Sequence, residues 1–544
     1  MKNILFITAD QWRGDCISAL SPRTQGSDCT TVSGSAPVQT PHLDGLAEEG
    51  VLFTRHYAQA VPCGPSRASL HTGMYLMNHR SGTNGTPLDA RHSNWALELR
   101  RAGYDPVLFG YTDTSVDPRL YEPDDPILRS YEGLLPGLTP GVVMENDVTP
   151  WVEWLRGKGV ETPAEGIALY RQKQGTLEWE DGADAPSALT LPAELHDTRF
   201  MTDQCMAYLA RATQPWCVHL SLLRPHPPWI APEPYNRLYP PGRLAAPVKC
   251  ATVADEARQH PWLAHQLERP LFRAPQCEAK LRRLKASYYG LMSEVDDNLG
   301  RLFQQLKHTD QWNDTLIVFT SDHGEQMGDH WLLGKCGYFD QSYHIPLIVR
   351  DPDARADGTR GEALNCFTEN VDIMPTLLDW CGLDIPVQCD GLSVLPLLHS
   401  RDAGKSSGET AKEKITDHWR KAVHWEYDFR DPANAVAEDE LQIGLHQCSL
   451  NVIRDEHYKY VHFSGLPPLL FDLQSDPEEF HNLAQNPDYQ SVLLSYTQQL
   501  LSWRMEHSEQ TLTHLLLTEE GVVERPMRRG KLSQKAEIIQ GELR

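Results

Sequence analysis

Several strongly apolar segments, far apart in the chain, each end abruptly in side chains that can bind metals or transfer protons. A continuously apolar strand is typical of the centre of a parallel sheet that is covered on both faces. Ligands bind at the carboxyl edge of such a sheet, so the pattern predicts an α/β fold with one shared polar site at that edge. The segments and the residues that follow them are 3–8 with Asp10 and Gln11, 106–110 with Tyr111 and Thr112, 216–222 with His226, and 316–320 with Asp322 and His323.

The stretch at 61–73, VPCGPSRASLHTG, comes after the first of these strand ends along the chain. A glycine and a proline after Cys63 shape a turn, Arg67 follows, and the pattern predicts a structured loop that leads into a helix. A lone cysteine beside a proline would mean little, because most cysteines are small buried hydrophobes. The full set, C-x-P-S-R followed by L-x-T-G, is a long motif that indicates chemistry at Cys63.

The length of 544 residues predicts either one large domain with an appendage or two to three domains. Residues 1–400 carry a repeating α/β pattern, interrupted at about 120–200 by an irregular stretch that we interpret as an insertion or lid. After a polar linker at 400–416, we expect a C-terminal antiparallel-sheet-plus-helix subdomain at 417–520. The charged tail at 521–544 could be disordered or serve as an oligomerisation arm.

The chain carries a formal net charge of −24. This excess argues against nucleic-acid binding, which needs clustered Lys and Arg, but a small anionic substrate is compatible with a locally positive site. The N-terminal apolar run is too short for a signal peptide, and no later stretch is long enough to span a bilayer, so no membrane partner is expected. Twelve cysteines without disulfide-like spacing fit a reducing compartment, and the cytoplasm is the expected location.

The order of these motifs resembles the alkaline phosphatase superfamily, and within it the phosphonate monoester hydrolase and type I sulfatase family. The motifs are DQ after the first strand, C-x-P-S-R, RPHPP, SDHGEQ with GDH, and LGK, and the likeness continues through YLMNHR, LDARH, EVDDNLGRLF and HYKYVHF. It covers nearly the whole chain except the loop at 20–36 and the far tail. The resemblance implies an alkaline-phosphatase-like α/β sandwich with a large mixed central sheet flanked by helices, plus a smaller C-terminal α+β domain.

The resemblance also implies a metal centre. Asp10, Gln11, Asp322 and His323 would surround one divalent cation, with residue 63 as a further ligand. Sulfatases of the calcium type usually present an Asp pair and Asp-Asn at these places. An imidazole in the shell favours a borderline transition metal instead. We therefore expect Mn²⁺ first, with Fe, Zn or Ca²⁺ as alternatives.

In this family the cysteine at the position of Cys63 is oxidised to formylglycine before the chain folds, which implies a formylglycine-generating enzyme as a maturation partner. The hydrated aldehyde has two hydroxyls: one attacks phosphorus or sulfur, and the other later expels the bound group. Arg67 would orient this diol, and Lys335 would contact a non-bridging oxygen of the substrate. Either His226 or Lys335 would protonate the leaving oxygen. The residues that resemble the family's substrate contacts are Asn84, Tyr111 and Thr112.

Two residues depart from the family pattern. His71 replaces a residue that is usually apolar in the L-x-T-G half of the motif, and we interpret it as a packed helix residue. Asp113 stands where close relatives tend to carry a small hydroxyl residue. A carboxylate there would repel an anionic ester, so either it points away from the site or the substrate preference differs.

The leading hypothesis is a metal-dependent hydrolase of phosphonate monoesters and phosphate diesters, promiscuous toward sulfate esters, that acts on a small anionic ester. A dedicated arylsulfatase-type enzyme with the same nucleophile is the first alternative. A two-metal phosphodiesterase with unmodified Cys63 is the second, and His226 with Asp329-His330 are its candidate extra ligands. A non-catalytic protein that retains the fold is the alternative from another class. By resemblance we also expect a homo-oligomer, either a dimer or a homotetramer.

Overall fold

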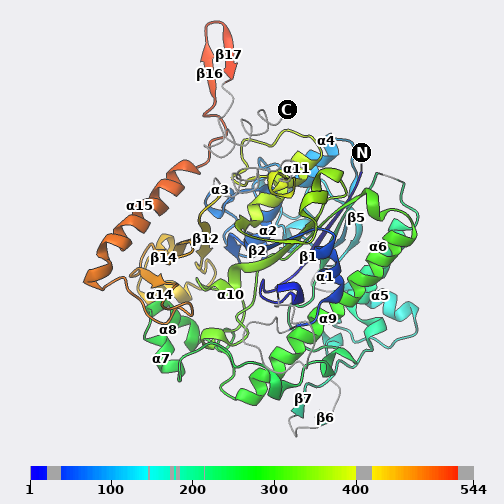
Figure 1. Cartoon of the computed structure of the whole chain (residues 1–544), viewed down its shortest axis with the longest axis horizontal. Coiled ribbons are helices and arrows are strands. Elements are labelled where there is room, and N and C mark those ends of the chain that lie inside the picture. The colour runs from blue at the N-terminus through cyan, green and yellow to red at the C-terminus, as the bar shows by residue number, and fades with distance from the viewer. Residues whose placement is uncertain are drawn as a thin grey trace.

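The computed structural model describes residues 2–20, 38–144, 148–171, 177–178, 184–213, 215–399 and 419–524. The expected linker at 400–416, nearly all of the loop at 20–36 and the tail after residue 524 lie outside these residues. A large central sheet lies between two groups of helices, and a smaller sheet with helix α15 (Gln490–Glu506) stands to one side (Figure 1). The expected α/β sandwich with a large mixed sheet is confirmed.

The central sheet has eight strands in the order β11-β2-β10-β9-β1-β8-β4-β5, with β11 (Glu362–Glu369) at one edge. At its centre, β1 (Asn3–Ala9) runs parallel to β8 (Cys217–Leu222) and to β9 (Thr315–Thr320). Every residue of these three strands is buried, because the strands are apolar and helices cover both faces. The sheet is mixed because β10 (His344–Arg350) runs antiparallel to β9.

Helices cover both faces of this sheet. Successive residues of β1 point to opposite faces, so each face of the strand packs into a different core. Leu5 and Ile7 belong to one hydrophobic core, and Ile4 and Phe6 belong to the other. The helices of the first core are α1 (Pro41–Glu48), α6 (Asp197–Leu209) and α9 (Glu278–His308), and those of the second are α2 (Cys63–Thr72), α4 (Trp95–Arg101) and α11 (Ile373–Trp380).

The region at 120–200 contributes an edge strand to the central sheet. β5 (Thr139–Val143) pairs in parallel with β4 (Pro106–Gly110). Its sequence, TPGVV, contains Pro and Gly and has no fully buried residue, so it lacks the apolar pattern of the central strands. Helix α5 (Thr149–Gly157) follows, and its Trp151 is buried in the first core.

The smaller sheet has the order β15-β14-β13-β12-β3. Its C-terminal strands pair antiparallel, and α15 packs against them. The fifth strand, β3 (Ala60–Val61), comes from the N-terminal part of the chain and runs parallel to β12. The smaller sheet therefore reaches the residues directly before Cys63. The C-terminal strands are β12 (Val423–Asp428), β13 (Ser449–Arg454), β14 (Tyr458–Phe463) and β15 (Leu469–Asp472).

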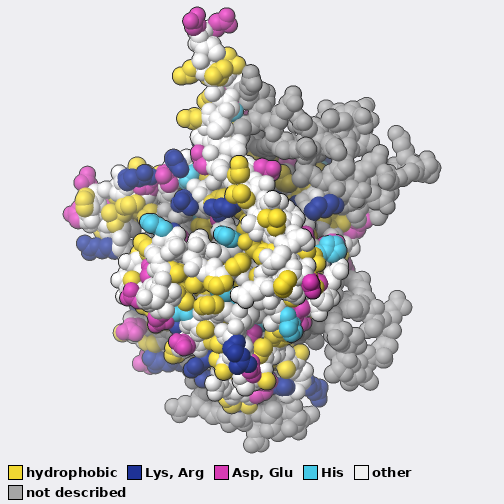
Figure 2. All heavy atoms as spheres, turned by 90° about the vertical axis from the view of Figure 1, so that its left-hand side faces the viewer, with side chains coloured by type: hydrophobic (Ala, Val, Ile, Leu, Met, Phe, Trp, Pro, Cys, Tyr) yellow, Lys and Arg dark blue, Asp and Glu magenta, His cyan; other side chains and the backbone are white. Residues whose placement is uncertain are grey.

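A two-stranded hairpin, β16 (Leu515–Thr518) and β17 (Gly521–Glu524), projects from the body of the protein (Figure 1). All eight strand residues are exposed. Figure 2 shows hydrophobic side chains along this projection and acidic side chains at its tip. The start of the charged tail is therefore an ordered hairpin with an apolar surface.

Shorter elements connect these parts. No helix in the described portions of the chain combines the length and the apolar character that crossing a membrane requires. The remaining elements are β2 (Val51–Tyr57), α3 (Leu76–His79), β6 (Leu177–Glu178), β7 (Asp184–Ala185), α7 (Val253–Ala257), α8 (Pro261–Glu268), α10 (Asp340–Tyr343), α12 (Leu395–Leu398) and α14 (Val436–Leu441).

Candidate active site

Two neighbouring parallel strands and one helix bring the expected metal ligands together. Thr8 of β1 pairs with Thr320 of β9, so the two strands end at the same edge of the sheet. Cys63 is the first residue of α2 at that edge. The result is a buried cluster whose ligand atoms all lie within 4.8 Å of one another, formed by Asp10, Cys63, Asp322 and His323.

The contacts within this cluster suit a divalent cation. His323 Nε2 lies 3.3 Å from Cys63 Sγ and 3.7 Å from both Asp10 Oδ1 and Asp322 Oδ2. Asp10 Oδ1 is buried and has no hydrogen-bond partner among the described residues. A buried carboxylate oxygen without a partner is costly, and a metal ion would satisfy it. Two carboxylates and an imidazole are ligands that first-row transition metals accept.

Gln11 lies beside the cluster in a left-handed backbone conformation, with φ at 68°. Its backbone N–H donates to Asp322 Oδ1 at 3.1 Å, which joins the ends of β1 and β9. Its side-chain Oε1 accepts a hydrogen bond from Lys335 Nζ at 2.9 Å, and its Nε2 donates to Glu325. The amide oxygen therefore faces the side of the site where Lys335 approaches Cys63.

Arg67 is fully buried and connects the ends of the strands. Its Nε donates to Asp322 Oδ2 at 3.0 Å, and its Nη2 lies 3.2 Å from Asp10 Oδ2. Its Nη1 donates to the Tyr111 carbonyl and to Ser221 Oγ. These bonds use four of the five N–H donors of the guanidinium. Arg67 therefore acts on the site mainly through the two carboxylates.

Lys335 directly contacts the side chain at position 63. Its Nζ donates to Cys63 Sγ at 2.9 Å. Burial lowers the pKa of Lys335, but its interactions with Cys63 and with the carboxylates of Asp10 and Asp322 raise it above its usual value, so the ammonium is charged. The arrangement places a fixed positive charge beside the position that a substrate oxygen would take during attack from residue 63.

The same surroundings shift the two carboxylates in opposite directions. Burial raises the pKa of Asp10, but nearby histidines, Lys335 and Arg67 hold it well below its usual range. Burial and the charge of Asp10 raise the pKa of Asp322. Burial, with the charge of Lys335, lowers the pKa of His323 to about 3, so this imidazole is neutral and able to bind a metal.

His226 lies at the end of β8, on the turn formed by RPHPP. Its Nδ1 lies 2.8 Å from the Pro227 carbonyl, so Nδ1 carries the proton and Nε2 is free. Burial, with the charge of Lys335, lowers the pKa of His226 to about 3. His226 is one of the groups that set the pKa of Asp10, which places it near the cluster.

The three expected substrate-contact residues differ in their positions relative to the cluster. Asn84 is exposed, and its Oδ1 accepts from the backbone N–H of Gly64 at 2.9 Å. The Tyr111 hydroxyl donates to Asp10 Oδ2, and its ring lies 4.2 Å from the Arg67 guanidinium. The structure does not bring Thr112 to the cluster, because its hydroxyl bonds to the backbone of residues 133 and 135.

The two departures from the family pattern have clear positions. His71 is buried and accepts a hydrogen bond from Trp95 Nε1 at 3.0 Å, so it is a packed helix residue as expected. Asp113 is 8% exposed, and its Oδ2 lies 3.8 Å from Arg67 Nε, so its carboxylate faces the site. Burial raises the pKa of Asp113 to about 6.

Two of the three candidate ligands for a second metal are engaged elsewhere. Asp329 pairs with Arg13 at 2.7 Å, and His330 Nδ1 lies 2.9 Å from Glu256 Oε1. The described residues contain one other group that could hold a metal, formed by His42, Asp296 and Asp297. It shares no residue with the cluster at Cys63. The geometry weighs against a two-metal site.

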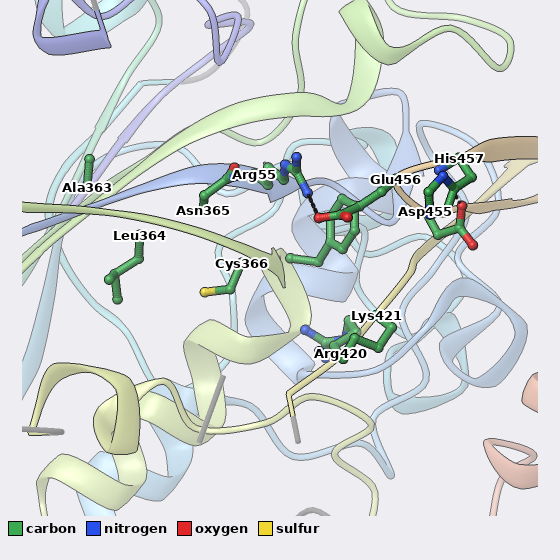
Figure 3. Close-up of a pocket in the computed structure, with 11 residues that line it drawn as sticks. Arg55, Ala363, Leu364, Asn365, Cys366, Arg420, Lys421, Asp455, Glu456 and His457 are labelled. Atoms are coloured by element: carbon green, nitrogen blue, oxygen red, sulfur yellow. Dashed lines mark hydrogen bonds and ion pairs between the residues drawn. The ribbon is translucent and has the colours of Figure 1, made fainter. Parts of the chain in front are cut away.

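A separate surface pocket of about 500 Å³ lies between β11 and the smaller sheet (Figure 3). An ion pair of 2.7 Å between Arg55 and Glu456 crosses it. Arg420 and Lys421 also line it. None of the residues of the cluster lines this pocket, so it is distinct from the candidate active site.

Glu325 and Ser221 were missed by the sequence reasoning. Glu325 is a fully buried acid within SDHGEQ whose carboxylate contacts Gln11, and its position two residues after His323 was the available signal. Ser221 is inside an apolar strand, and nothing in the sequence shows that its hydroxyl receives Arg67.

The fold and the site together define an alkaline-phosphatase-like hydrolase that acts on ester bonds. A family model described as Sulfatase matches residues 2–383, and a second, described as N-sulphoglucosamine sulphohydrolase, C-terminal, matches residues 328–506. The chain belongs to the sulfatase family.

Relatives span almost the whole chain. The multifunctional alkaline phosphatase superfamily protein PehA of Trinickia caryophylli is 41% identical over 535 residues, which cover 96% of this chain and 99% of that protein. The phosphonate monoester hydrolase of Agrobacterium radiobacter has a TM-score of 0.85 and 43% identity, covering 97% of this chain and 100% of that one. SpPMH, a phosphonate monoester hydrolase from Silicibacter pomeroyi, has a TM-score of 0.84 and 36% identity, covering 96% and 99%. The expected family resemblance, fold class and enzyme class are confirmed.

Proposed function

We propose that this protein is a formylglycine-dependent hydrolase of phosphonate monoesters and phosphate diesters that also accepts sulfate esters. The observation that carries the proposal is the buried cluster of Asp10, Cys63, Asp322 and His323 with Lys335 on the Cys63 sulfur. The names of the solved structures at 43% and 36% identity, both phosphonate monoester hydrolases, support phosphonate esters over sulfate esters as the preferred class.

Cys63 is poorly suited to act as a thiol nucleophile. Burial and the charge of Asp10 raise its pKa well above the usual value of a cysteine, so little thiolate would form. Its Sγ atom marks the place that an oxygen of formylglycine would take. Hydrated formylglycine would supply an oxygen nucleophile at this position, and a formylglycine-generating enzyme would act on the chain during maturation.

The residues present fit one divalent metal ion. Asp10, Gln11, Asp322 and His323 would hold it, with Mn²⁺ as our first choice because a neutral imidazole joins oxygen ligands. The metal would supply positive charge that lowers the pKa of the attacking hydroxyl. Arg67 keeps both carboxylates in place through its ion pairs.

The remaining residues have separable tasks in this proposal. Lys335 binds a non-bridging oxygen and offsets the charge that develops there. Tyr111 fixes the Asp10 carboxylate through its hydroxyl. Lys335, or His226 after it takes up a proton at Nε2, protonates the leaving oxygen when its bond to phosphorus or sulfur breaks. A small ester with one negative charge suits a site that already contains several carboxylates.

Mass spectrometry of the peptide that contains residue 63 tests the nucleophile. Conversion of the cysteine to formylglycine lowers the peptide mass by about 18 Da, and an unmodified thiol in fully active enzyme would refute the proposal. The substrate class is tested by kcat/KM for an aryl phosphonate monoester against an aryl sulfate. We expect the phosphonate to be preferred, and a large excess for sulfate would favour a dedicated sulfatase.

A further inference from the structure

Glu325 is a buried acid next to the candidate metal site that does not belong to the metal-capable cluster. It is fully buried in the turn after β9. Its Oε1 accepts hydrogen bonds from the backbone N–H groups of Met327 and Gly334, both at 2.8 Å. Its Oε2 accepts a hydrogen bond from Gln11 Nε2. Both oxygens therefore have partners inside the protein.

The contact with Glu325 determines which end of the Gln11 amide faces the cluster. The oxygen and nitrogen of an amide have nearly the same shape, so their hydrogen-bond partners decide the orientation. Glu325 Oε1 is occupied by two backbone N–H groups and its Oε2 accepts from Gln11 Nε2, so the Gln11 nitrogen faces Glu325. The amide oxygen then faces the opposite way, where Lys335 Nζ lies 2.9 Å from it.

The same carboxylate also holds the loop that carries Lys335. Gly334 directly precedes Lys335, has φ at 84°, and donates its N–H to Glu325. Glu325 therefore contacts both Gln11 and the loop that carries Lys335. The ammonium group contacts both the Gln11 amide oxygen and the Cys63 sulfur, each at 2.9 Å.

We propose that Glu325 is a positioning residue that turns the Gln11 amide oxygen toward the metal and holds the Lys335 loop beside it. The inference rests on the proposed function, because it treats the cluster as a metal site. A purely structural role would be to satisfy the two backbone N–H groups of the turn. The two roles differ in what they predict for metal binding.

The Glu325→Gln variant separates these roles. The backbone N–H groups of Met327 and Gly334 still require an acceptor, so the new amide oxygen stays with them and the new NH₂ group faces Gln11. Two NH₂ groups cannot hydrogen-bond to each other, so the Gln11 amide turns over and presents its nitrogen to Lys335. We expect at least a tenfold weaker affinity for Mn²⁺, measured by calorimetric titration of metal-free protein.

The exchange variant Gln11→Glu with Glu325→Gln provides the rescue. The amide at position 325 then donates to a carboxylate at position 11, whose second oxygen faces Lys335 and the metal. We expect the double variant to bind Mn²⁺ more tightly than Glu325→Gln alone. The single Gln11→Glu variant places two carboxylates against each other and completes the cycle.

Glu256→Gln is the matched control. Glu256 is another buried glutamate, which accepts from Cys250 N–H and pairs with His330, and it belongs to neither metal-capable group. We expect it to leave Mn²⁺ affinity unchanged. Wild-type affinity in Glu325→Gln, or a double variant no better than that single one, would overturn the inference. Absence of metal binding by wild-type protein with formylglycine at position 63 would instead overturn the metal site of the proposed function, and this inference with it.

Discussion

Lys335 and Arg67 both bring positive charge to the site, but they act on different groups. Lys335 touches the side chain at position 63 and, after its bonds to Cys63 and Gln11, retains one N–H donor for a substrate oxygen. Arg67 is enclosed by the carboxylates and carbonyl that it holds. Substitution of Lys335 should therefore lower turnover, whereas substitution of Arg67 should lower both turnover and the stability of the folded state.

For Lys335→Ala we expect kcat/KM to fall by on the order of 10²- to 10³-fold, because a charge that stabilises the transition state is lost. The melting temperature should change little. Arg67→Ala is the comparison, and it should also lose about 3–5 kcal/mol of unfolding free energy, because it leaves buried carboxylates without their partner. Kinetics with an aryl phosphonate and chemical denaturation measure the two effects. Similar activity of Lys335→Ala and wild type would contradict the assignment.

Asp113 predicts a pH dependence of substrate binding. Its pKa is raised to about 6 by burial, so the carboxyl is neutral below that pH and anionic above it. Repulsion of an anionic ester should therefore grow as the pH rises from 5 to 7, and KM should increase by on the order of tenfold at most. Asp113→Asn should remove this dependence, whereas Asp117→Asn, at a carboxylate paired with Arg119, should retain it. An unchanged profile in Asp113→Asn would refute this role.

At the residue scale, the sequence indicates which residue types form the site but not the direction in which each side chain points. Asp10, Cys63, Asp322 and His323 could be expected together because each follows a recognisable strand or lies within a long motif. The direction of the Thr112 hydroxyl could not be predicted, because it bonds to the backbone of a loop that is distant in sequence. The direction of the Asp113 side chain likewise depends on a contact with Arg67 that no local pattern indicates.

At the scale of elements, the turn after β8 shows how a helix holds a functional loop. Arg224 donates through Nε and Nη2 to Asp197 Oδ2, at 3.1 and 2.9 Å. Its Nη1 donates to the His226 carbonyl at 2.6 Å. Asp197 is the first residue of α6, so the start of this helix fixes the turn that presents His226.

The rigid placement of His226 leads to a test of the two candidate general acids. If His226 protonates the leaving oxygen, His226→Ala should slow esters of alkyl alcohols by roughly 10²-fold or more, because alkoxides need a proton to leave. Esters of p-nitrophenol, whose anion leaves readily, should be affected much less. Equal losses for both substrate classes would exclude His226 as the acid and favour Lys335. Steady-state kcat values across a series of leaving groups give the answer.

The central strands could be predicted from sequence closely, whereas the edge strands could not. β1, β8 and β9 are buried on both faces, so their apolar runs are evident. β5 is a partly exposed strand that contains Pro and Gly, and β3 has only two residues. Both exist because a neighbouring strand supplies hydrogen bonds, and tertiary pairing of that kind leaves no local pattern.

At the scale of the whole molecule, the hairpin of β16 and β17 is an apolar surface that the other described residues leave exposed. Leu517 is 80% exposed and Val522 is 64% exposed, and the two are paired across the hairpin. Exposed apolar patches often mark sites of protein association. This surface is where we expect the homo-oligomer to form.

The variant Leu517→Glu with Val522→Glu tests that expectation. Charged side chains at an apolar interface should shift the assembly toward smaller species, as measured by light scattering at several concentrations. The melting behaviour of the protomer should be retained, because these side chains are exposed within it. Leu494→Glu, at a 59% exposed position on α15, is the control. An unchanged molar mass in the double variant would contradict the role of the hairpin.

The pairing of β3 with β12 also has a consequence for the order of events during synthesis. Ala60 pairs with Glu426 and Val61 with Tyr427, so the segment before Cys63 acquires its partner strand only after most of the chain has been made. At roughly 5–20 residues per second, the ribosome needs about 20 to 70 seconds to make the intervening chain. In the folded protein Cys63 is only 4% exposed. Under the proposed function, the late completion of this sheet keeps the cysteine within reach of its modifying enzyme for most of the time that the chain is being made.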